Sequence, residues 1–179
     1  MWSLKEQYKN VAVPLMLKEL GYKNKMALPK IAKVVIDIGI GSVKDENQKN
    51  MIEKQLTDIV GQKLVKSAAK KSIASFKTRV GSHIGYNVSL RGDRMYDFLN
   101  KMVYVAIPRR RDFRGLNLKS IDQMGNLTIG FKEHVVFPEM AGEDIKNSFG
   151  FGVTIVTTSR NKKEATSLFK ALNFPFAKK

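Results

Sequence analysis

The sequence has no cysteine, a single tryptophan and only two histidines among its 179 residues. The absence of cysteine excludes disulfide bonds, thiolate zinc sites and a thiol nucleophile. His83 and His134 lie far apart in the sequence, and no carboxylates with ligand spacing support either of them, so we expect neither a metal nor a cofactor. No apolar run approaches the about 20 residues of a membrane-spanning helix. We therefore expect a cytoplasmic protein without a membrane partner.

Acidic residues are also scarce. The chain has 32 Lys and Arg against 16 Asp and Glu, which gives a formal net charge of +16. Residues 1–119 hold 24 of the basic and 10 of the acidic residues, whereas residues 120–179 hold eight and six. An imbalance of this size favours a polyanionic partner. Length and a 43% hydrophobic content predict a single domain, 1–179. The charge distribution divides this domain into a basic part at about 1–119, which we expect to be the RNA-binding part, and a less basic part at about 120–179.

The segment from Ile59 to Gly92, which we call the acid-free segment, contains no Asp or Glu at all, yet it carries seven Lys and Arg residues. Two aromatic residues, Phe76 and Tyr86, lie among these cations. RNA suits such a surface, since phosphates bind the cations and unstacked bases can stack on rings. The alternative interpretation is a solvated basic face above buried aromatic side chains.

Hydrophobic periodicity predicts an α+β order of elements along the chain. A helix over about 3–20 should kink or restart at Pro14 and stop at Gly21. The remaining predicted elements are a strand over 33–40, a helix from the cap Asp45 to near Gly61, strands around 73–78 and 86–90, a helix capped by Asp93 and ended by Pro108, loops and short strands over 120–150, a strand over 151–158, and a helix begun by the pair Asn161 and Glu164.

Residues for catalysis are not evident. The turn from Gly39 to Lys44 follows a predicted strand, but it lacks both the third glycine of a dinucleotide loop and the ending of a Walker loop. The central position of the run Gly81 to Gly85 is His83, where a nucleophile elbow requires serine. We expect no enzyme, and the alternative is a nucleotide-dependent enzyme that uses the Gly39–Lys44 turn. A peripheral membrane protein is less favoured, because no helix combines a Lys-rich face with a bulky apolar one.

Six segments in order resemble one family. They are KVVIDIGIG at 33–41, GQKLVKSAAKKSIASFKTRVG at 61–81, IGYNVSLRGDRMYDFLNKM at 84–102, IPRRRDFRGLN at 107–117, VVFPE at 135–139 and NFPF at 173–176. Together they resemble the bacterial-type large-subunit ribosomal protein five family, whose members bind 5S ribosomal RNA. The resemblance covers essentially the whole chain.

The resemblance implies an α+β fold, in which a curved, antiparallel-rich (mixed) sheet has helices packed on one side in a single domain. It implies a structural constituent of the large ribosomal subunit that anchors 5S rRNA in the central protuberance. The implied partners are 5S rRNA, 23S-type rRNA of the large subunit, peptidyl-site tRNA, a small-subunit head protein at an intersubunit bridge, and neighbouring large-subunit proteins.

The implied contact residues fall mostly within the acid-free segment. The 5S rRNA contacts of the family correspond here to Gln62, Lys63, Lys70, Lys71, Ser72, Phe76, Lys77 and Arg79. The loop that reaches the tRNA corresponds to Val80, Gly81, Ser82, His83, Ile84 and Gly85. The charge pattern adds a further basic set, since guanidinium groups bind phosphate and carboxylate in bidentate fashion: Arg91, Arg109, Arg110, Arg111 and Arg114.

Several positions depart from the family pattern. Asp37 stands where the family commonly has an RNA-contacting Asn, so a donor is lost, a negative charge is gained, and we do not count Asp37 among the RNA ligands. Ser89 replaces Thr, His83 replaces Pro in the tRNA-facing loop, and Arg110 replaces an aliphatic residue. The usual Phe-Asp-Gly-Arg-Gly-Asn run is interrupted near the expected bridge by Ile121, Gln123 and Met124.

Overall fold

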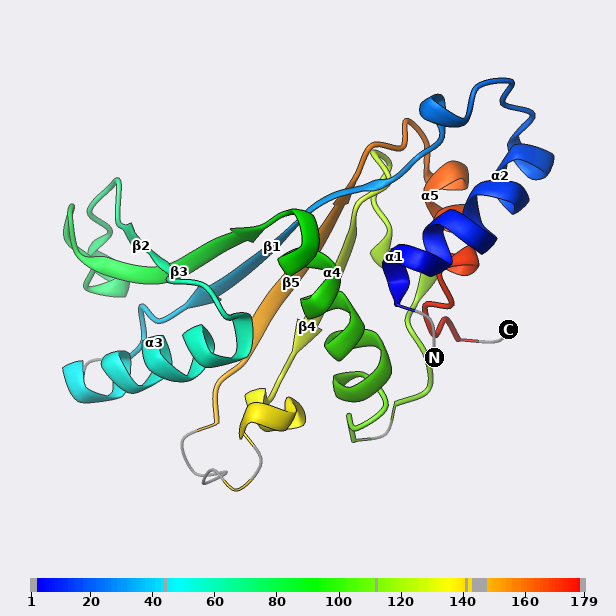
Figure 1. Ribbon diagram of the computed structural model, residues 1–179. Coiled ribbons are helices and arrows are strands. Elements are labelled where there is room, and N and C mark those ends of the chain that lie inside the picture. The colour runs from blue at the N-terminus through cyan, green and yellow to red at the C-terminus, as the bar shows by residue number, and fades with distance from the viewer. Residues whose placement is uncertain (1–2, 44, 112, 141, 143–147, 178–179) are drawn as a thin grey trace. The chain divides into compact units, whose positions relative to one another are not determined.

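The computed structural model describes residues 3–43, 45–111, 113–140, 142 and 148–177 (Figure 1). The α-helices are α1 (Leu4–Gln7), α2 (Val13–Leu20), α3 (Glu46–Val60), α4 (Gly92–Lys101) and α5 (Lys162–Ala171). The strands are β1 (Ile31–Gly39), β2 (Val65–Ala68), β3 (His83–Leu90), β4 (Leu127–Phe131) and β5 (Phe151–Thr157). Shorter helical segments are η1 (Tyr8–Ala12), η2 (Lys25–Ala27), η3 (Ala74–Phe76), η4 (Met102–Ala106), η5 (Leu118–Ser120), η6 (His134–Val136) and η7 (Pro138–Met140).

The five strands form one sheet in the order β2-β3-β1-β5-β4. β2 pairs with β3 antiparallel, with a register shift between Ser67 and Ala68. Side chains alternate between a buried and a more accessible side along β5, β4 and most of β3, as a sheet covered on one face requires. The predicted α+β class, an antiparallel sheet with packed helices, is confirmed.

The first helical region shows how local sequence sets its bounds. Ser3 and Glu6 form a reciprocal capping box at the start of α1. Pro14 lies in the first turn of α2, and the π-helical η1 directly precedes it. α1, η1 and α2 follow one another without a gap, so the chain has a π-helical turn before Pro14 in place of the predicted restart, and such a turn is one way in which a helix interrupts its regular hydrogen bonds. Gly21 ends the helix at φ 68°, in the left-handed region, as predicted.

Two predicted helix starts need correction. Asp93 does not cap α4; Arg91 holds the N-cap position, and Asp93 lies in the first turn, where it pairs with Lys5. Asn161 is the N-cap of α5 but its side chain makes no capping hydrogen bond, while Glu164 accepts one from the Arg160 N–H. Both helices still form, because their apolar stripes are buried as the periodicity predicts.

The backbone contacts divide the described chain into two compact units. Unit 1 comprises residues 1–34, 90–129 and 154–179, and unit 2 comprises residues 35–89 and 130–153. The single domain expected from the sequence stays a prediction. In unit 1, α2 packs on α5 and α1 on α4, around side chains such as Leu99, Leu168 and Phe169. In unit 2, α3 contributes Ile52, Leu56 and Ile59 to the core, and the strand residues Ile36, Ile38, Tyr86 and Val88 are buried with them.

The predicted strand at residues 73–78 is wrong. The chain there forms the 3-10 turn η3, and only an isolated bridge joins Ile73 to Thr78. The strand that pairs with β3 is instead β2, at residues 65–68, which alternation did not reveal because its side chains are largely exposed. Figure 1 shows β2 and β3 side by side, with the intervening loop beyond their ends.

Candidate nucleic-acid interface

Residues 69–82 form a loop between β2 and β3 that we call the basic loop. At its base the Ala69 N–H donates to the Ser82 carbonyl at 2.9 Å, and the Gly81 N–H donates to the Ala69 carbonyl at 3.0 Å. Farther out, Ile73 and Thr78 exchange backbone hydrogen bonds of 3.0 and 3.2 Å. A loop closed on itself in this way keeps a defined shape without a strand ladder.

Two serine hydroxyls form hydrogen bonds with the backbone of the basic loop. The Ser72 hydroxyl accepts from the Val80 N–H at 3.1 Å, and the Ser82 hydroxyl accepts from the Arg79 N–H at 3.1 Å and donates to the Arg79 carbonyl. Lys77 follows η3 with φ 51°, a left-handed conformation that is uncommon outside glycine. These contacts use the small polar groups inside the loop and leave its long cationic side chains outside.

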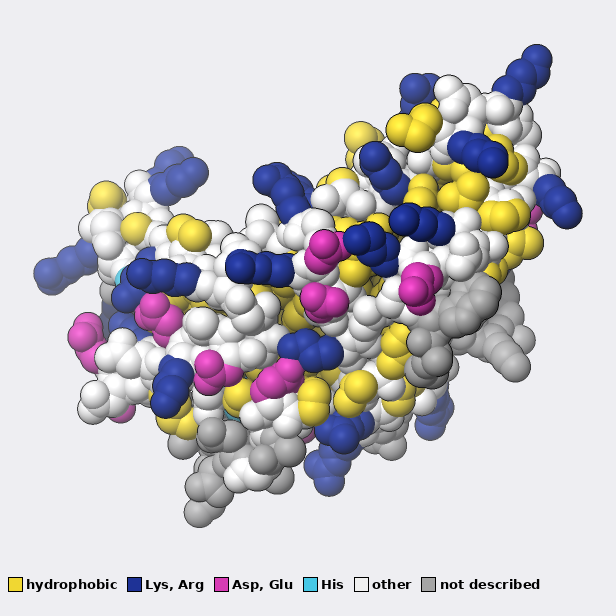
Figure 2. Space-filling model, viewed as in Figure 1, with side chains coloured by type: hydrophobic (Ala, Val, Ile, Leu, Met, Phe, Trp, Pro, Cys, Tyr) yellow, Lys and Arg dark blue, Asp and Glu magenta, His cyan; other side chains and the backbone are white. Residues whose placement is uncertain are grey.

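Six of the sequence-predicted 5S contacts lie in this loop, whereas Gln62 and Lys63 precede β2 at the other end of the hairpin, and most of the eight are exposed. Phe76 is 75% exposed, which is unusual for an aromatic side chain. In the part of the chain that the structure describes, no ion pair involves the exposed cations Lys63, Lys70, Lys71, Lys77 and Arg79. Figure 2 shows dark-blue basic side chains over the β2–β3 region with hydrophobic atoms exposed between them, and magenta acids over α3. Of the two interpretations, the exposed ring of Phe76 favours a binding surface over buried aromatics.

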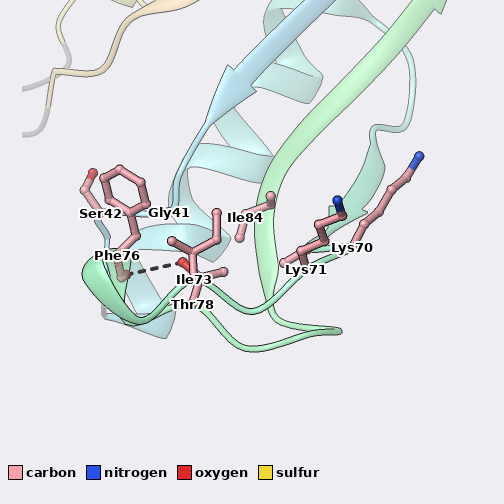
Figure 3. Close-up of a pocket in the computed structure, with 9 residues that line it drawn as sticks. Gly41, Ser42, Lys70, Lys71, Ile73, Phe76, Thr78 and Ile84 are labelled. Carbon is pink, nitrogen blue, oxygen red and sulfur yellow. Dashed lines mark hydrogen bonds between the residues drawn. The ribbon is translucent and has the colours of Figure 1, made fainter.

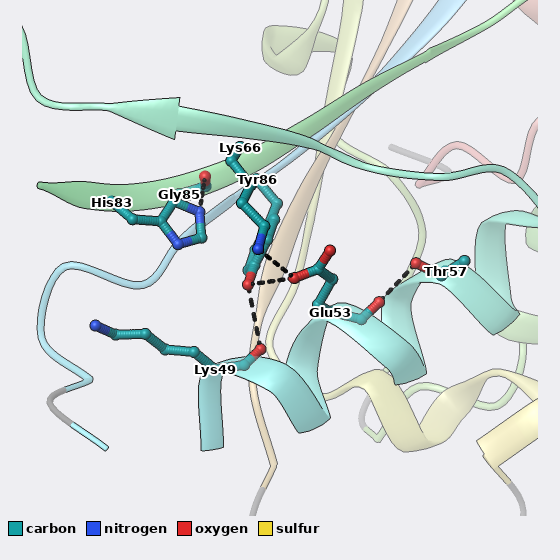
Figure 4. Close-up of polar contacts among 7 residues, drawn as sticks. All are labelled: Lys49, Glu53, Thr57, Lys66, His83, Gly85 and Tyr86. Atoms are coloured by element: carbon teal, nitrogen blue, oxygen red, sulfur yellow. Dashed lines mark hydrogen bonds and ion pairs between the residues drawn. The ribbon is translucent and has the colours of Figure 1, made fainter. Parts of the chain in front are cut away.

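Lys66 is the exception among the cations of the acid-free segment. Its Nζ lies 3.3 Å from the Glu53 carboxylate of α3, which also accepts a 2.9 Å hydrogen bond from the Tyr86 hydroxyl (Figure 4). Burial raises the pKa of Tyr86 to about 12, with help from Glu53. Burial also acts to raise the pKa of Glu53, but the hydrogen bonds from Tyr86 and Lys66 outweigh it and lower that pKa. Tyr86 is therefore the buried aromatic side chain that ties β3 to α3, and Glu53 stays ionised.

The strands of unit 2 present a polar face opposite α3, which we call the open face. Asp37, Asn87 and Ser89 are exposed there, next to Gln62, whose side-chain amide lies 3.5 Å from the Ser89 carbonyl. Asn87 donates to the Ser67 hydroxyl at 2.7 Å, which links β3 to β2. The sequence analysis did not select Asn87 or Ser67, although polar residues alternating with Tyr86 and Val88 were the signal for Asn87.

Asp37 projects over β5 on the open face. A Cβ at Gly152 would lie 3.1 Å from the Asp37 carboxylate, so the glycine makes room for that side chain. Within the described residues no Lys or Arg forms an ion pair with Asp37. The open face of unit 2 thus carries one uncompensated negative charge.

The predicted tRNA-facing segment divides between loop and strand. Val80, Gly81 and Ser82 lie in the basic loop, whereas His83, Ile84 and Gly85 already belong to β3. A ring nitrogen of His83 lies 2.9 Å from the Gly85 carbonyl, and the imidazole packs edge-on against Tyr86, with ring centroids 4.4 Å apart. Gly85 has no room for a side chain, since an added Cβ would meet the Ile38 carbonyl oxygen at 2.6 Å.

The additional basic residues predicted as contacts belong to unit 1. Arg91, Arg109, Arg111 and Arg114 are exposed, and the Arg110 guanidinium lies 5.9 Å from the centre of the Phe113 ring. Such a cation–π contact keeps Arg110 beside an aromatic surface that RNA bases or a partner protein could use.

The glycine turn considered for a nucleotide is an ordinary tight turn as far as it is described, and Lys44 lies outside the described residues. The Ile40 N–H donates to the Ile84 carbonyl at 2.8 Å and the Val43 N–H to the Ile40 carbonyl at 3.0 Å. Asp45 caps α3 by accepting from the Asn47 N–H at 3.0 Å, so a carboxylate occupies a donor that a phosphate would need.

Within the described ranges, no three His, Asp or Glu side chains gather closely enough to hold a metal ion. Among the helices that the structure describes, none has the length and apolar character to cross a membrane.

Comparison with known proteins accounts for this combination of exposed cations, an exposed ring and an α+β sheet. Residues 24–79 match the family model described as ribosomal protein L5, and residues 83–176 match the model for the C-terminus of the same ribosomal family. The chain belongs to the ribosomal protein L5 family. A large ribosomal subunit protein uL5 from Desulfotalea psychrophila is 45% identical over 99% of this chain and the whole of that protein. The uL5 of Nitratidesulfovibrio vulgaris (strain DP4) is 47% identical, with 99% and 100% of the two chains covered, and that of Fervidobacterium nodosum is 45% identical, with 98% and 96% covered.

Membership in the L5 family gives the chain a structural role in the ribosome and places it in the large subunit of the cytoplasmic ribosome. The predictions of a non-enzymatic protein and of a bacterial-type L5 relative are confirmed. The nucleotide-dependent enzyme is therefore set aside.

Proposed function

We propose that this L5-family chain binds 5S ribosomal RNA through the basic loop and the adjoining open face of unit 2, and helps anchor that RNA in the central protuberance of the large subunit. The observation that carries the proposal is that the exposed ring of Phe76 shares the basic loop with four exposed cations, Lys70, Lys71, Lys77 and Arg79, none of which forms an ion pair within the described residues. Lysine and arginine neutralise phosphates and release counterions, while a ring offers stacking to bases that have left a helix.

The same surface supplies groups that can read RNA shape. Gln62 and Ser89 lie beside each other, and the hydroxyl and amide groups of Ser67 and Asn87 line the neighbouring positions. Polar groups of this kind suit 2′-hydroxyls and base edges in a shallow groove. Because the loop is closed by its own backbone hydrogen bonds, the positions from which its cationic side chains extend are set before RNA arrives.

The test is a titration of the purified protein against 5S rRNA at 50 and 200 mM salt, with tRNA and an unrelated duplex as competitors. If about six phosphates are neutralised, affinity should fall roughly a thousandfold between these salt concentrations. Tight binding that survives both competitors is expected. Equal affinity for all three RNAs would contradict the proposal, because net charge alone would then explain binding.

The proposal extends to the segment that leads from the base of the basic loop into β3, where Val80, Gly81 and Ser82 would contact peptidyl-site tRNA, followed by His83, Ile84 and Gly85 at the start of the strand. Gly81 has φ 83°, so Gly81→Val should distort this segment through backbone strain. We expect ribosomes carrying this variant to lose footprint protection of the tRNA while 5S binding by the free protein is retained. Loss of both to the same extent would argue against two separate contact surfaces.

We propose that the unit 1 arginines contact 23S-type rRNA or neighbouring large-subunit proteins. We also propose that the less basic part, residues 120–179, contacts a small-subunit head protein at an intersubunit bridge. Support comes from the exposure of Arg109, Arg111 and Arg114 beside the Arg110–Phe113 contact. Hydroxyl-radical footprints of the large subunit with Arg109→Ala and Arg111→Ala should change outside 5S rRNA; changes confined to 5S rRNA would contradict this assignment.

A further inference from the structure

The basic loop and the turn after β1 line an open hollow of about 730 Å³ in unit 2. Its lining combines apolar side chains with hydroxyls and two cations: Gly41, Ser42, Ala69, Lys70, Lys71, Ile73, Phe76, Thr78 and Ile84. A volume of this size is typical of sites for small organic groups. The walls come from three separate stretches of chain, so the hollow exists only because the loop folds back toward the turn.

The two ends of the hollow carry different side chains (Figure 3). Phe76 and Ser42 lie at one end, Ile73 and Ile84 lie between, and the Lys70 and Lys71 side chains extend at the other end. The Thr78 hydroxyl donates to the Phe76 carbonyl at 3.2 Å, which fixes the turn that carries the ring. Within the described part of the chain, no protein group forms a hydrogen bond with the Ser42 hydroxyl, so its donor and acceptor capacity is open.

Resting on the proposed function, we infer that this hollow takes one unstacked nucleobase of 5S rRNA, whose flanking phosphates lie on Lys70 and Lys71. The lining meets the three requirements of such a group. Phe76 and the two isoleucines offer apolar area to both faces of a planar ring, Ser42 offers a polar atom to its edge, and the lysines offer cations to the backbone on either side.

Charge complementarity favours a nucleic-acid occupant over an apolar protein segment. The acid-free segment supplies seven of the nine residues that line the hollow, and an apolar peptide would leave Lys70 and Lys71 without counterions. A base inside a duplex cannot enter, because its faces are covered by its neighbours. The occupant must therefore come from a loop or bulge, where unstacking costs least.

Gly41 offers a way to fill the hollow without removing a charge. It lines the hollow, an added Cβ would meet nothing within 4 Å, and its φ lies outside the left-handed region. Gly41→Phe should therefore fold normally and place a ring where the base would go. Phe76→Ala is the complementary change, which removes the stacking surface from a side chain that is already 75% exposed.

Both variants should weaken 5S rRNA binding roughly 5- to 150-fold, the range that corresponds to loss of one base–aromatic stack. Their salt dependence should match that of the unmodified protein, because no phosphate contact is lost. Phe76→Trp should keep the affinity, since it keeps a ring. Met124→Ala is the matched control, an exposed apolar side chain at 67% that lies in unit 1 and outside the hollow.

Chemical probing of the Watson–Crick edges of 5S rRNA supplies a readout independent of affinity. We expect one unpaired base to be protected by the unmodified protein and to regain reactivity in a saturated complex with Gly41→Phe. If the unmodified protein binds 5S rRNA specifically while Gly41→Phe binds equally well and protects the same bases, the pocket inference fails and the proposed function stands. If the unmodified protein does not prefer 5S rRNA over tRNA, the proposed function fails and the inference with it.

Discussion

Lys66 and Glu53 face each other across β2 and α3, with 3.3 Å between the amine and the carboxylate. This ion pair sets Lys66 apart from the other cations of the acid-free segment. Charge alone would give all of them the same role in RNA binding, whereas the pairing predicts that Lys66 contributes less than Lys71.

We predict that Lys71→Met lowers the slope of log affinity for 5S rRNA against log salt by about 0.7 to 0.9, as expected for one lost phosphate contact. Lys66→Met should change the slope by less than half of that. Because the Lys66–Glu53 pair is partly exposed, unfolding free energy should change by less than about 1 kcal/mol in either variant. Salt-dependent binding and urea unfolding measure the two quantities, and equal slopes for the two variants would mean that Lys66 leaves Glu53 for RNA.

Asp37→Asn should strengthen 5S binding. The change removes the negative charge of Asp37, which forms no ion pair among the described residues, and supplies an amide donor, and we expect a gain on the order of threefold at 50 mM salt. Asp58→Asn is the control, since it makes the same charge change at an exposed position of α3. If both variants gain affinity equally, the net charge of the protein accounts for the effect and the position of Asp37 does not.

Tyr86→Phe should remove a contribution to folding stability that is itself lost at alkaline pH. The pKa of Tyr86 is raised from its ordinary value of 10 to about 12, so its contribution is fully present below pH 10 and is lost as pH rises toward 12. At pH 7 the variant should lose about 1–3 kcal/mol of unfolding free energy, because Glu53 and the Lys49 carbonyl both lose a donor. The stability difference between the two proteins should shrink between pH 10 and 12.

Tyrosine absorbance at 295 nm followed against pH gives the ionisation directly, as the difference between the unmodified protein and Tyr86→Phe. Glu53→Gln should move the Tyr86 transition part of the way back toward 10, because burial remains while the charge is lost. A Tyr86 transition near 10 in the unmodified protein would contradict the buried hydrogen bond.

Lys77→Gly should have opposite effects on folding stability and on 5S rRNA binding. Lys77 has φ 51°, and relief of this left-handed conformation by glycine should raise unfolding free energy by up to about 1 kcal/mol. The same change should weaken 5S binding and lower its salt slope, since a cation is lost. Lys71→Gly, which loses an equal charge at a residue without positive φ, should weaken binding with no gain in stability. Increased 5S affinity of Lys77→Gly would show that loop strain opposes RNA binding.

Much of the fold could be predicted from the sequence because its signals are local. The stripe of Ile52, Leu56 and Ile59, the cap at Asp45 and the glycine at Gly61 define α3 without reference to the rest of the chain. The predicted strand over 151–158 is likewise confirmed by β5, in which Val153 and Ile155 are buried.

The hairpin that carries the candidate site could not be predicted in the same way. β2 is an edge strand with exposed residues, so no apolar alternation marks it, and its existence depends on the pairing of Val65 to Ala68 with β3. Residues around Ile73 and Phe76 do alternate, but they form a turn closed by long-range and local hydrogen bonds. The ion pair of Lys66 with Glu53 could not be predicted either, because charge counts do not show which cation lies beside a carboxylate in the fold.

The shortness of β2 has a consequence for the protein before it meets RNA. Edge strands expose unpaired N–H and C=O groups that can recruit another chain, and long flat edges promote aggregation. Here the edge is four residues long, carries Lys66, and is interrupted by the register shift after Ser67. The β2 edge is therefore a poor template for pairing with the sheet of a second copy while the proposed RNA partner is absent.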